Sequence, residues 1–163
     1  METCRYKCFL VNYAKILNMA KNEAKEKIEK LVEKYTSLAA QEADKYSEEE
    51  TKKDFILPLF GALGWDTTDK KEVSAEEHIE SSGRVDYGFY LNGRVQFYLE
   101  AKPFKVDLHK EDFAKQAIRY SWNKGATWAV LTDFERIKVF NAQDIEKSLA
   151  GKLYFEIPCE QFL

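Results

Sequence analysis

The sequence is poor in the residues that build disulfide frameworks and thiolate metal sites. It has three cysteines, Cys4, Cys8 and Cys159, and two histidines. The number of cysteines is odd, and their spacing is not that of a zinc site. We therefore expect neither a disulfide-stapled secreted domain nor a cysteine-ligated metal, and a reducing compartment fits better.

Long apolar runs are also missing. No segment of 18 apolar residues occurs, and the first apolar run, residues 8–11, is too short for the hydrophobic region of a signal peptide. We therefore expect a cytoplasmic protein without a membrane partner.

An excess of positive charge is the third absence. The chain has 25 Lys and Arg against 28 Asp and Glu, a net charge of −3. Any contact with phosphate must therefore come from a local cluster of Lys and Arg. What is present, 45% hydrophobic and 33% charged residues in 163, is typical of one globular domain with a sizeable core.

The chain is organised around the stretch GRVDYGFYLNGRVQFYLEAK, residues 83–102. Two apolar, aromatic-rich runs, 85–91 and 95–99, flank Asn92-Gly93. This dipeptide most readily supplies the two positive φ angles of a tight hairpin turn. The pattern predicts a β-hairpin.

Charged side chains gather at the open end of this predicted hairpin. Asp86 lies near the start of the first strand, and Glu100 and Lys102 lie at the end of the second, so antiparallel pairing brings them together. Glu100 and Lys102 are two residues apart and therefore share one face of a strand. Carboxylate oxygens suit a hard cation such as Mg²⁺, and a lysine can orient or help to deprotonate an attacking water. The grouping predicts metal-assisted hydrolysis.

These residues resemble the core motif of the PD-(D/E)XK nucleases, an acid on one strand and acid-x-Lys on the next. Here the motif reads Asp86, thirteen residues, then Glu100-Ala101-Lys102, without the proline that often precedes the first acid. The strings GRVDYGF and YLEAK resemble the N-terminal nuclease domain of type I restriction enzyme motor subunits and related restriction endonucleases. The resemblance covers about residues 47–140. It implies that Asp86, Glu100 and the Ala101 carbonyl hold Mg²⁺, with Mn²⁺ as a substitute, while Lys102 positions the water.

Acid-x-Lys alone is a weak pattern in a chain so rich in charge. Two further Glu-x-Lys copies, residues 23–25 and 50–52, lie in segments with helical patterns, where positions two apart do not share a face. We therefore interpret Lys25 and Lys52 as solvated charge. Charged residues at strand ends are often simply exposed as well, but the hairpin geometry favours the catalytic interpretation of the third copy.

A helix is predicted before the hairpin. Ser47 and Glu50 have the spacing of a capping box, the apolar pattern runs to Leu63, Gly64 ends it, and Pro58 is expected to perturb it. The segment resembles the first helix of restriction-type nucleases, whose acid faces the metal site. Glu50 is the matching residue, so it has two alternative roles, in the cap or in the catalytic site.

A second helix is predicted after the hairpin, over residues 110–124. Its Gln116 and Tyr120 are four apart and share a face. Helical Gln-x-x-x-Tyr after the acid-x-Lys strand resembles a motif of RecB-type and type I restriction nucleases, which implies support of the site and of the nucleic acid backbone. The alternative is a surface amide and a tyrosine at the edge of the core. The apolar side of this helix is expected to comprise Phe113, Ala117, Ile118 and Trp122.

Two further apolar runs, 126–131 and 137–140, predict buried strands, and a short helix and a strand at 154–157 are expected after them. The order strand, helix, strand requires a crossover and therefore a parallel pair. We predict a restriction-endonuclease-like α/β domain over residues 47–163, with a mixed central β-sheet flanked by helices. Residues 1–46 have a helical pattern and are expected to form an N-terminal helical extension.

The sequence thus predicts a Mg²⁺-dependent endodeoxyribonuclease of the restriction-modification type, acting on DNA as the nuclease domain of a larger enzyme. The expected catalytic residues are Asp86, Glu100, Lys102, Glu50, Gln116 and Tyr120. One alternative is a non-catalytic nucleic-acid-binding or assembly module with the same fold, and another is a protein-interaction domain. The basic residues near the site alternate with acids, so sequence recognition or translocation is expected of further domains or subunits.

Overall fold

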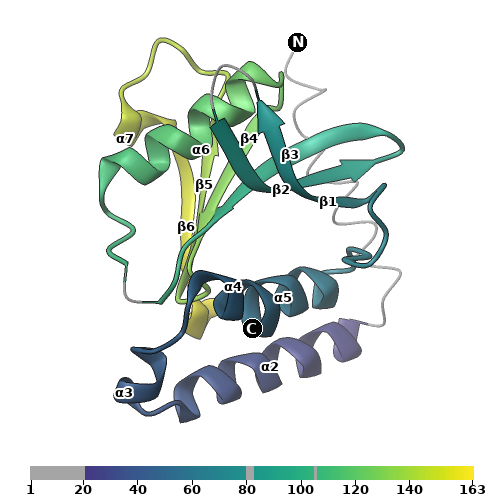
Figure 1. The fold of residues 1–163 in the computed structure, drawn as a ribbon, viewed down its shortest axis with the longest axis vertical. Coiled ribbons are helices and arrows are strands. Elements are labelled where there is room, and N and C mark those ends of the chain that lie inside the picture. Colours follow the sequence, from purple (N-terminus) through teal and green to yellow (C-terminus); the bar gives the residue numbers. More distant parts are fainter. Residues whose placement is uncertain (1–20, 80–82, 105) are drawn as a thin grey trace.

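A six-stranded sheet forms the centre of the computed structural model, which describes residues 21–79, 83–104 and 106–163 (Figure 1). The strands lie in chain order, and every described neighbouring pair is antiparallel except β3 and β4, which are parallel. The mixed sheet with a parallel pair is therefore confirmed. The strands are β1 Val73–Ile79, β2 Gly83–Leu91, β3 Arg94–Ala101, β4 Trp128–Thr132, β5 Arg136–Asn141 and β6 Leu153–Pro158.

Helices cover both faces of the sheet. Figure 1 shows α2 and α5 beneath one face and α6 across the other. The helical elements are α2 Lys21–Ser37, α3 Ala40–Ala43, α4 Glu48–Thr51, the π-helix Lys52–Ile56, α5 Leu57–Ala62, α6 Glu111–Asn123, α7 Leu149–Lys152 and a 3₁₀ turn at Cys159–Gln161. The predicted α/β fold is therefore the observed one.

The predicted hairpin is β2 and β3. Asn92 and Gly93 have φ angles of 51° and 72°, which are the two left-handed positions that this turn requires. Phe89 pairs with Phe97, and their rings stack with centroids 4.4 Å apart. The register set by the tight turn shifts by one residue between Phe89 and Tyr90, so the turn and this bulge together decide which residues meet at the open end.

The sheet is buried on both sides. On β4, Val130 packs into the core that α2 and α5 cover, whereas Ala129 and Leu131 pack against Ala117 and Ile118 of α6. This explains the continuous apolar run in the sequence, because a strand covered on both faces has no polar side. Trp122 does not follow the prediction for this helix, since it is 43% exposed.

The helix that begins after Ser47 contains a π-turn. The Leu57 N–H donates to the Lys52 carbonyl, five residues back. Pro58 has no N–H to offer the Asp54 carbonyl, which accepts a hydrogen bond from Lys34 of α2 at 3.4 Å instead. The perturbation predicted at Pro58 is thus a widened turn, a feature that is frequent at functional sites.

Part of the predicted N-terminal extension packs onto the sheet. Ile28 of α2 is buried in the same core as the sheet residues, and the Tyr35 hydroxyl donates to Glu135 at 2.6 Å. Residues 1–20, with Cys4 and Cys8, lie outside the described residues, and Cys159 is a buried free thiol. The division at residues 46 and 47 stays a prediction.

Across the described ranges, no helix is long and apolar enough to cross a membrane.

Candidate active site

The hairpin brings Asp86 and Glu100 together at its open end. Tyr87 pairs with Leu99 there, and the two acids each lie one residue beyond that pair. Lys102 follows at the end of β3, where its N–H donates to the Thr132 carbonyl of β4 at 2.9 Å. The three side chains predicted to converge therefore lie in one region, at the edge where β3 and β4 end.

Asp86 is held by both of its carboxylate oxygens. Oδ2 accepts a hydrogen bond from the Ala101 N–H at 2.7 Å, and Oδ1 lies 2.5 Å from the Lys52 ammonium. The Asp86 side chain is 15% exposed. The bond to Ala101 links the two strands of the hairpin and fixes the carboxylate beside the acid-x-Lys segment.

Glu100 lies deeper. Its Oε1 accepts from Lys102 Nζ at 2.6 Å and from Gln116 Nε2 at 2.8 Å, and the side chain is 5% exposed. Burial is the main cause that raises the Glu100 pKa to about 7; Asp86 and Glu48 act in the same direction, and the Lys102 ammonium opposes them. A carboxyl group with this pKa gains and loses a proton near neutral pH, as functional carboxyl groups often do.

Lys52 is a member of this cluster that the sequence interpretation missed. Its side chain is 8% exposed, and its ammonium lies 2.9 Å from Glu48, 2.8 Å from Glu49 and 2.5 Å from Asp86. Burial alone would lower the Lys52 pKa, but hydrogen bonds to Asp86, Glu49 and Glu48 outweigh it and raise the pKa. The interpretation of Lys52 as solvated charge is therefore wrong.

Glu48 connects the two lysines. Its Oε1 lies 2.9 Å from Lys52 Nζ, and its Oε2 lies 4.0 Å from Lys102 Nζ. Glu48 is thus an acid of this helix that lies near both lysines, whereas Glu49 contacts Lys52. The spacing of Glu48 and Lys52, four residues apart on a helix, was the available signal.

Of its two alternative roles, Glu50 has the one in the helix cap. Its Oε2 accepts hydrogen bonds from the Ser47 N–H at 2.8 Å and from the Ser47 hydroxyl at 2.6 Å, and these bonds lower the Glu50 pKa. The Glu50 N–H donates back to the Ser47 hydroxyl at 3.2 Å. The capping box is complete, and the structure does not bring Glu50 into the acidic cluster.

Helix α6 presents Gln116 and Tyr120 to the sheet. Gln116 holds Glu100 directly. Tyr120 is 1% exposed and packs with Val85 and Tyr98 in a small cluster beneath the open end of the hairpin. Burial, together with the nearby Glu100 charge, raises the Tyr120 pKa. Gln116 therefore positions a carboxylate of the cluster, whereas Tyr120 supports the strands that carry it.

The donor set suits a hard divalent cation by its chemistry. Asp86 and Glu100 supply carboxylate oxygens. Ala101, whose carbonyl is the third predicted ligand, lies beside them because its N–H donates to Asp86. Across the described residues, no three acidic, histidine or cysteine side chains stand in metal-binding geometry. A cation here would therefore use two carboxylates, with backbone oxygen and solvent completing its shell, as Mg²⁺ commonly does. The ion pair between Lys52 and Asp86 would then have to break.

Three other polar residues lie elsewhere. Asp133 lies between β4 and β5; its carboxylate accepts a hydrogen bond from the Arg136 N–H at 3.0 Å, and burial raises its pKa to about 7. His109, in the loop before α6, lies 3.1 Å from Arg136 Nη1. His78 falls in β1, but its side chain lies outside what the structure describes.

Comparison with known proteins agrees with a restriction-type domain. No family model matches the sequence. The type II restriction enzyme and methyltransferase RM.Eco57I of Escherichia coli is 30% identical over an alignment of 134 residues, which covers 74% of this chain and 13% of that protein. This similarity confirms the resemblance to restriction enzymes that GRVDYGF and YLEAK indicated. The chain corresponds to only a small part of that relative.

One solved structure also matches part of the chain. That of the type IIG restriction endonuclease BpuSI covers 50% of this chain and 10% of its own, with 18% identity and a TM-score of 0.44. An overlap this partial adds nothing to the argument about the site.

Proposed function

We propose that this restriction-endonuclease-like chain is the nuclease domain of a restriction-modification enzyme and hydrolyses DNA phosphodiester bonds with Mg²⁺. The observation that carries the proposal is the cluster of Asp86, Glu100 and Lys102 at the end of the hairpin. The relative named a restriction enzyme and methyltransferase supports DNA as the substrate class.

Each residue of the cluster has a role in this proposal. Asp86 and Glu100 would hold the cation with the Ala101 carbonyl. When bound, Mg²⁺ would polarise a phosphoryl oxygen and offset the charge that develops in the transition state. Lys102, 2.6 Å from Glu100, would orient the attacking water. Gln116 would keep Glu100 in an orientation that allows it to contact both the cation and Lys102.

Glu48 and Lys52 add a balance of charge that the motif alone does not contain. Four carboxylates, of Glu48, Glu49, Asp86 and Glu100, face the two ammonium groups of Lys52 and Lys102. An excess of carboxylate attracts a cation, and the two lysines limit the repulsion before it arrives. In this proposal Lys52 holds the Asp86 carboxylate in place until the cation binds there and displaces the Lys52 ammonium.

Sequence recognition is assigned to other parts of the enzyme. The net charge of −3 gives no general attraction to DNA, so binding by this chain alone should be weak and independent of sequence. The relative is much longer than this chain, which covers 13% of it. Further domains or subunits would supply base recognition or translocation.

A plasmid-cleavage assay tests the proposal. Purified chain is incubated with supercoiled plasmid in Mg²⁺, in Mn²⁺ or in EDTA, and Asp86→Ala is compared with Lys53→Ala, a change at a neighbouring exposed lysine. We expect nicking by wild type and Lys53→Ala in either metal, and none in EDTA or by Asp86→Ala. Cleavage by Asp86→Ala at the wild-type rate would end the nuclease assignment.

One observation favours a second candidate, a non-catalytic module with the same fold. Both oxygens of Asp86 already have partners, in Ala101 and Lys52, so a closed ion pair could stand where a metal would bind. Thermal melting with and without Mg²⁺ separates the two candidates. A catalytic site predicts a rise in melting temperature, about 5 °C at a hundredfold excess over Kd, that Asp86→Ala abolishes. A closed ion pair predicts no metal-dependent rise.

A further inference from the structure

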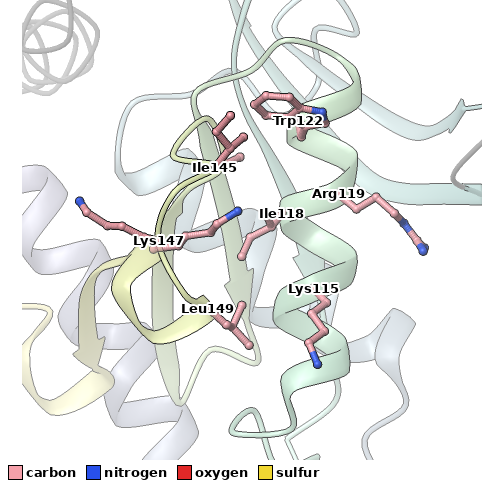
Figure 2. A pocket seen from close by; sticks show the side chains of 9 residues that line it. Lys115, Ile118, Arg119, Trp122, Ile145, Lys147 and Leu149 are labelled. Atoms are coloured by element: carbon pink, nitrogen blue, oxygen red, sulfur yellow. The ribbon is translucent and has the colours of Figure 1, made fainter.

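A basic groove lies on a different face of α6 from the one that holds Gln116. It encloses about 430 Å³ between α6 and the segment 142–152. Its floor is apolar, and Figure 2 shows Trp122 of α6 and Ile145 of the following loop at one end of it. Trp122 is 43% and Ile145 69% exposed. The lining residues are Lys115, Ile118, Arg119, Trp122, Ala142, Ile145, Lys147, Leu149 and Lys152.

The charge of this groove differs from that of the whole chain. The net charge is −3, yet the lining contains four basic residues and no acidic one. Acids outside the lining pair with Lys115 and Lys147: Glu111 with Lys115 at 2.7 Å, and Asp144 with Lys147 at 2.7 Å. The Lys115 pair is exposed at both ends and is therefore weak, whereas the Asp144 side chain is only 20% exposed.

The rim is built by two segments that are distant in the sequence. Lys115, Arg119 and Trp122 recur along one stripe of α6 at helical spacing. Lys147 and Lys152 come from the segment around α7, where the Lys147 stem lies against Gly151 so closely that a Cβ there would approach Lys147 Cβ to 3.1 Å. The Lys147 stem thus packs against the backbone of α7, while the side chain as a whole is 59% exposed.

We propose that this groove is a docking site for an acidic amphipathic helix of a protein partner. An apolar floor with a basic rim is complementary to a helix that carries Leu or Ile on one side and Glu or Asp beside them. Exposed aliphatic and tryptophan side chains in a groove are typical of protein interfaces. Single-stranded nucleic acid is a poorer fit, because it stacks on several aromatic rings and Trp122 is the one aromatic residue among those that line the groove. The site does not depend on the proposed nuclease activity.

Binding of designed peptides tests the proposal. The probe is an amphipathic peptide about 20 residues long, with Leu on one side and Glu flanking it, labelled for fluorescence anisotropy. Matched probes replace Glu by Lys or Leu by Gln, and a labelled oligonucleotide is the fourth. We expect the acidic amphipathic peptide to bind at least about tenfold more tightly than both matched peptides, with an affinity that falls as salt rises.

Variants place the binding site. Ile145→Ser and the double change Lys147→Glu with Lys152→Glu should each weaken binding of the acidic peptide at least about tenfold. Leu163→Ser, at another exposed apolar residue, and Lys30→Glu, on an exposed part of α2, are the matched controls. In ¹H–¹⁵N spectra the peptide should shift the indole signal of Trp122 but not that of Trp65, which is buried. None of these variants touches the acidic cluster, so plasmid cleavage should be unchanged in all of them.

Three outcomes would overturn the proposal. One is equal binding of the acidic peptide and its charge-reversed counterpart. Another is loss of oligonucleotide binding in the groove variants without an effect on peptide binding, which would assign the groove to nucleic acid. The third is a shift of the Trp122 signal with protein concentration alone, which would assign it to a second copy of this chain. A failure of plasmid cleavage in wild type would leave the peptide result untouched.

Discussion

Two copies of the same tripeptide pattern deliver their lysines to one site by different routes. Glu100-Ala101-Lys102 ends a strand, and its two charged side chains meet at 2.6 Å. Glu50-Thr51-Lys52 lies in a helix, where Glu50 turns away to Ser47 and Lys52 reaches Asp86 instead. The backbone period decides the outcome, because positions two apart share a face in a strand but not in a helix. The tripeptide pattern therefore indicates which charged residues could contribute to the site, and the secondary structure decides which of them come into contact.

Removal of the strand lysine should have the largest effect on activity. We expect Lys102→Ala to lower plasmid cleavage in Mg²⁺ at least about a hundredfold, the loss typical of a group that assists proton transfer. Circular dichroism and a thermal melt should show an intact fold, since Lys102 lies at the end of β3 rather than in the core. Lys53→Ala is the matched control. Wild-type cleavage by Lys102→Ala would remove the strand copy from the mechanism.

Removal of the helix lysine should show mainly in stability. Lys52→Ala leaves Asp86 largely buried without its cation, and breaking such a pair costs about 3 kcal/mol. Urea unfolding of wild type, Lys52→Ala and Lys53→Ala measures the difference, and Lys53→Ala should lie within about 0.5 kcal/mol of wild type. Addition of Mg²⁺ should restore part of the stability lost in Lys52→Ala, because a cation at Asp86 replaces the missing charge. Equal stability of the two variants would mean that the Lys52 ammonium contributes no more to stability than a solvated charge.

The contrast shows how far the sequence could predict this molecule. The hairpin followed from Asn92-Gly93 and the flanking apolar runs, since turn geometry and strand period are local properties. Lys52 could not be placed in this way. Its position depends on the helix that carries it packing against the hairpin, and the widened turn that starts at Lys52 depends on Pro58, six residues later.

The groove beyond α6 was missed for a similar reason. Trp122 has the spacing of a core residue on that helix, but the segment around Ile145 leaves it 43% exposed. The rim cations come from two segments whose approach no local pattern reports. Long-range packing, rather than local propensity, decides both regions.

The strand acid should make stability depend on pH. The Glu100 pKa is raised from 4.5 to about 7, so the folded state holds this proton more tightly than the unfolded state does. The stability gained is fully present below about pH 4.5 and is lost as pH rises through about 7, a change of up to about 3 kcal/mol.

Denaturant unfolding at a series of pH values measures this effect. Glu100→Gln carries no titrating group there, so it should lose this part of the pH dependence and gain stability over wild type at about pH 8. Glu111→Gln, at an exposed acid of α6, should keep the wild-type slope. Identical slopes for wild type and Glu100→Gln would place the Glu100 pKa near its ordinary value.

The smallest effects should separate the two acids of the helix copy. Glu48 contacts Lys52 at 2.9 Å and lies 4.0 Å from Lys102, so Glu48→Gln should misplace both ammonium groups and lower cleavage about tenfold. Glu50→Gln should leave cleavage unchanged, because glutamine also completes a capping box. Ser47→Ala removes that cap, so it should cost about 1 kcal/mol of stability without affecting cleavage.

Plasmid cleavage and urea unfolding of these three variants decide between the resemblance and the geometry. The resemblance to restriction-type nucleases matched Glu50 to the acid that faces the metal, whereas the contacts assign that position to Glu48. If Glu50→Gln lost cleavage while Glu48→Gln kept it, the helix would have to turn Glu50 toward the cluster during catalysis. The capping box would then have to open, and Ser47→Ala should in that case raise the cleavage rate. The opposite result would be loss of cleavage in Glu48→Gln alone. The site would then take Lys52, together with Glu48 one helical turn before it, from the helix, and both Glu100 and Lys102 from the strand.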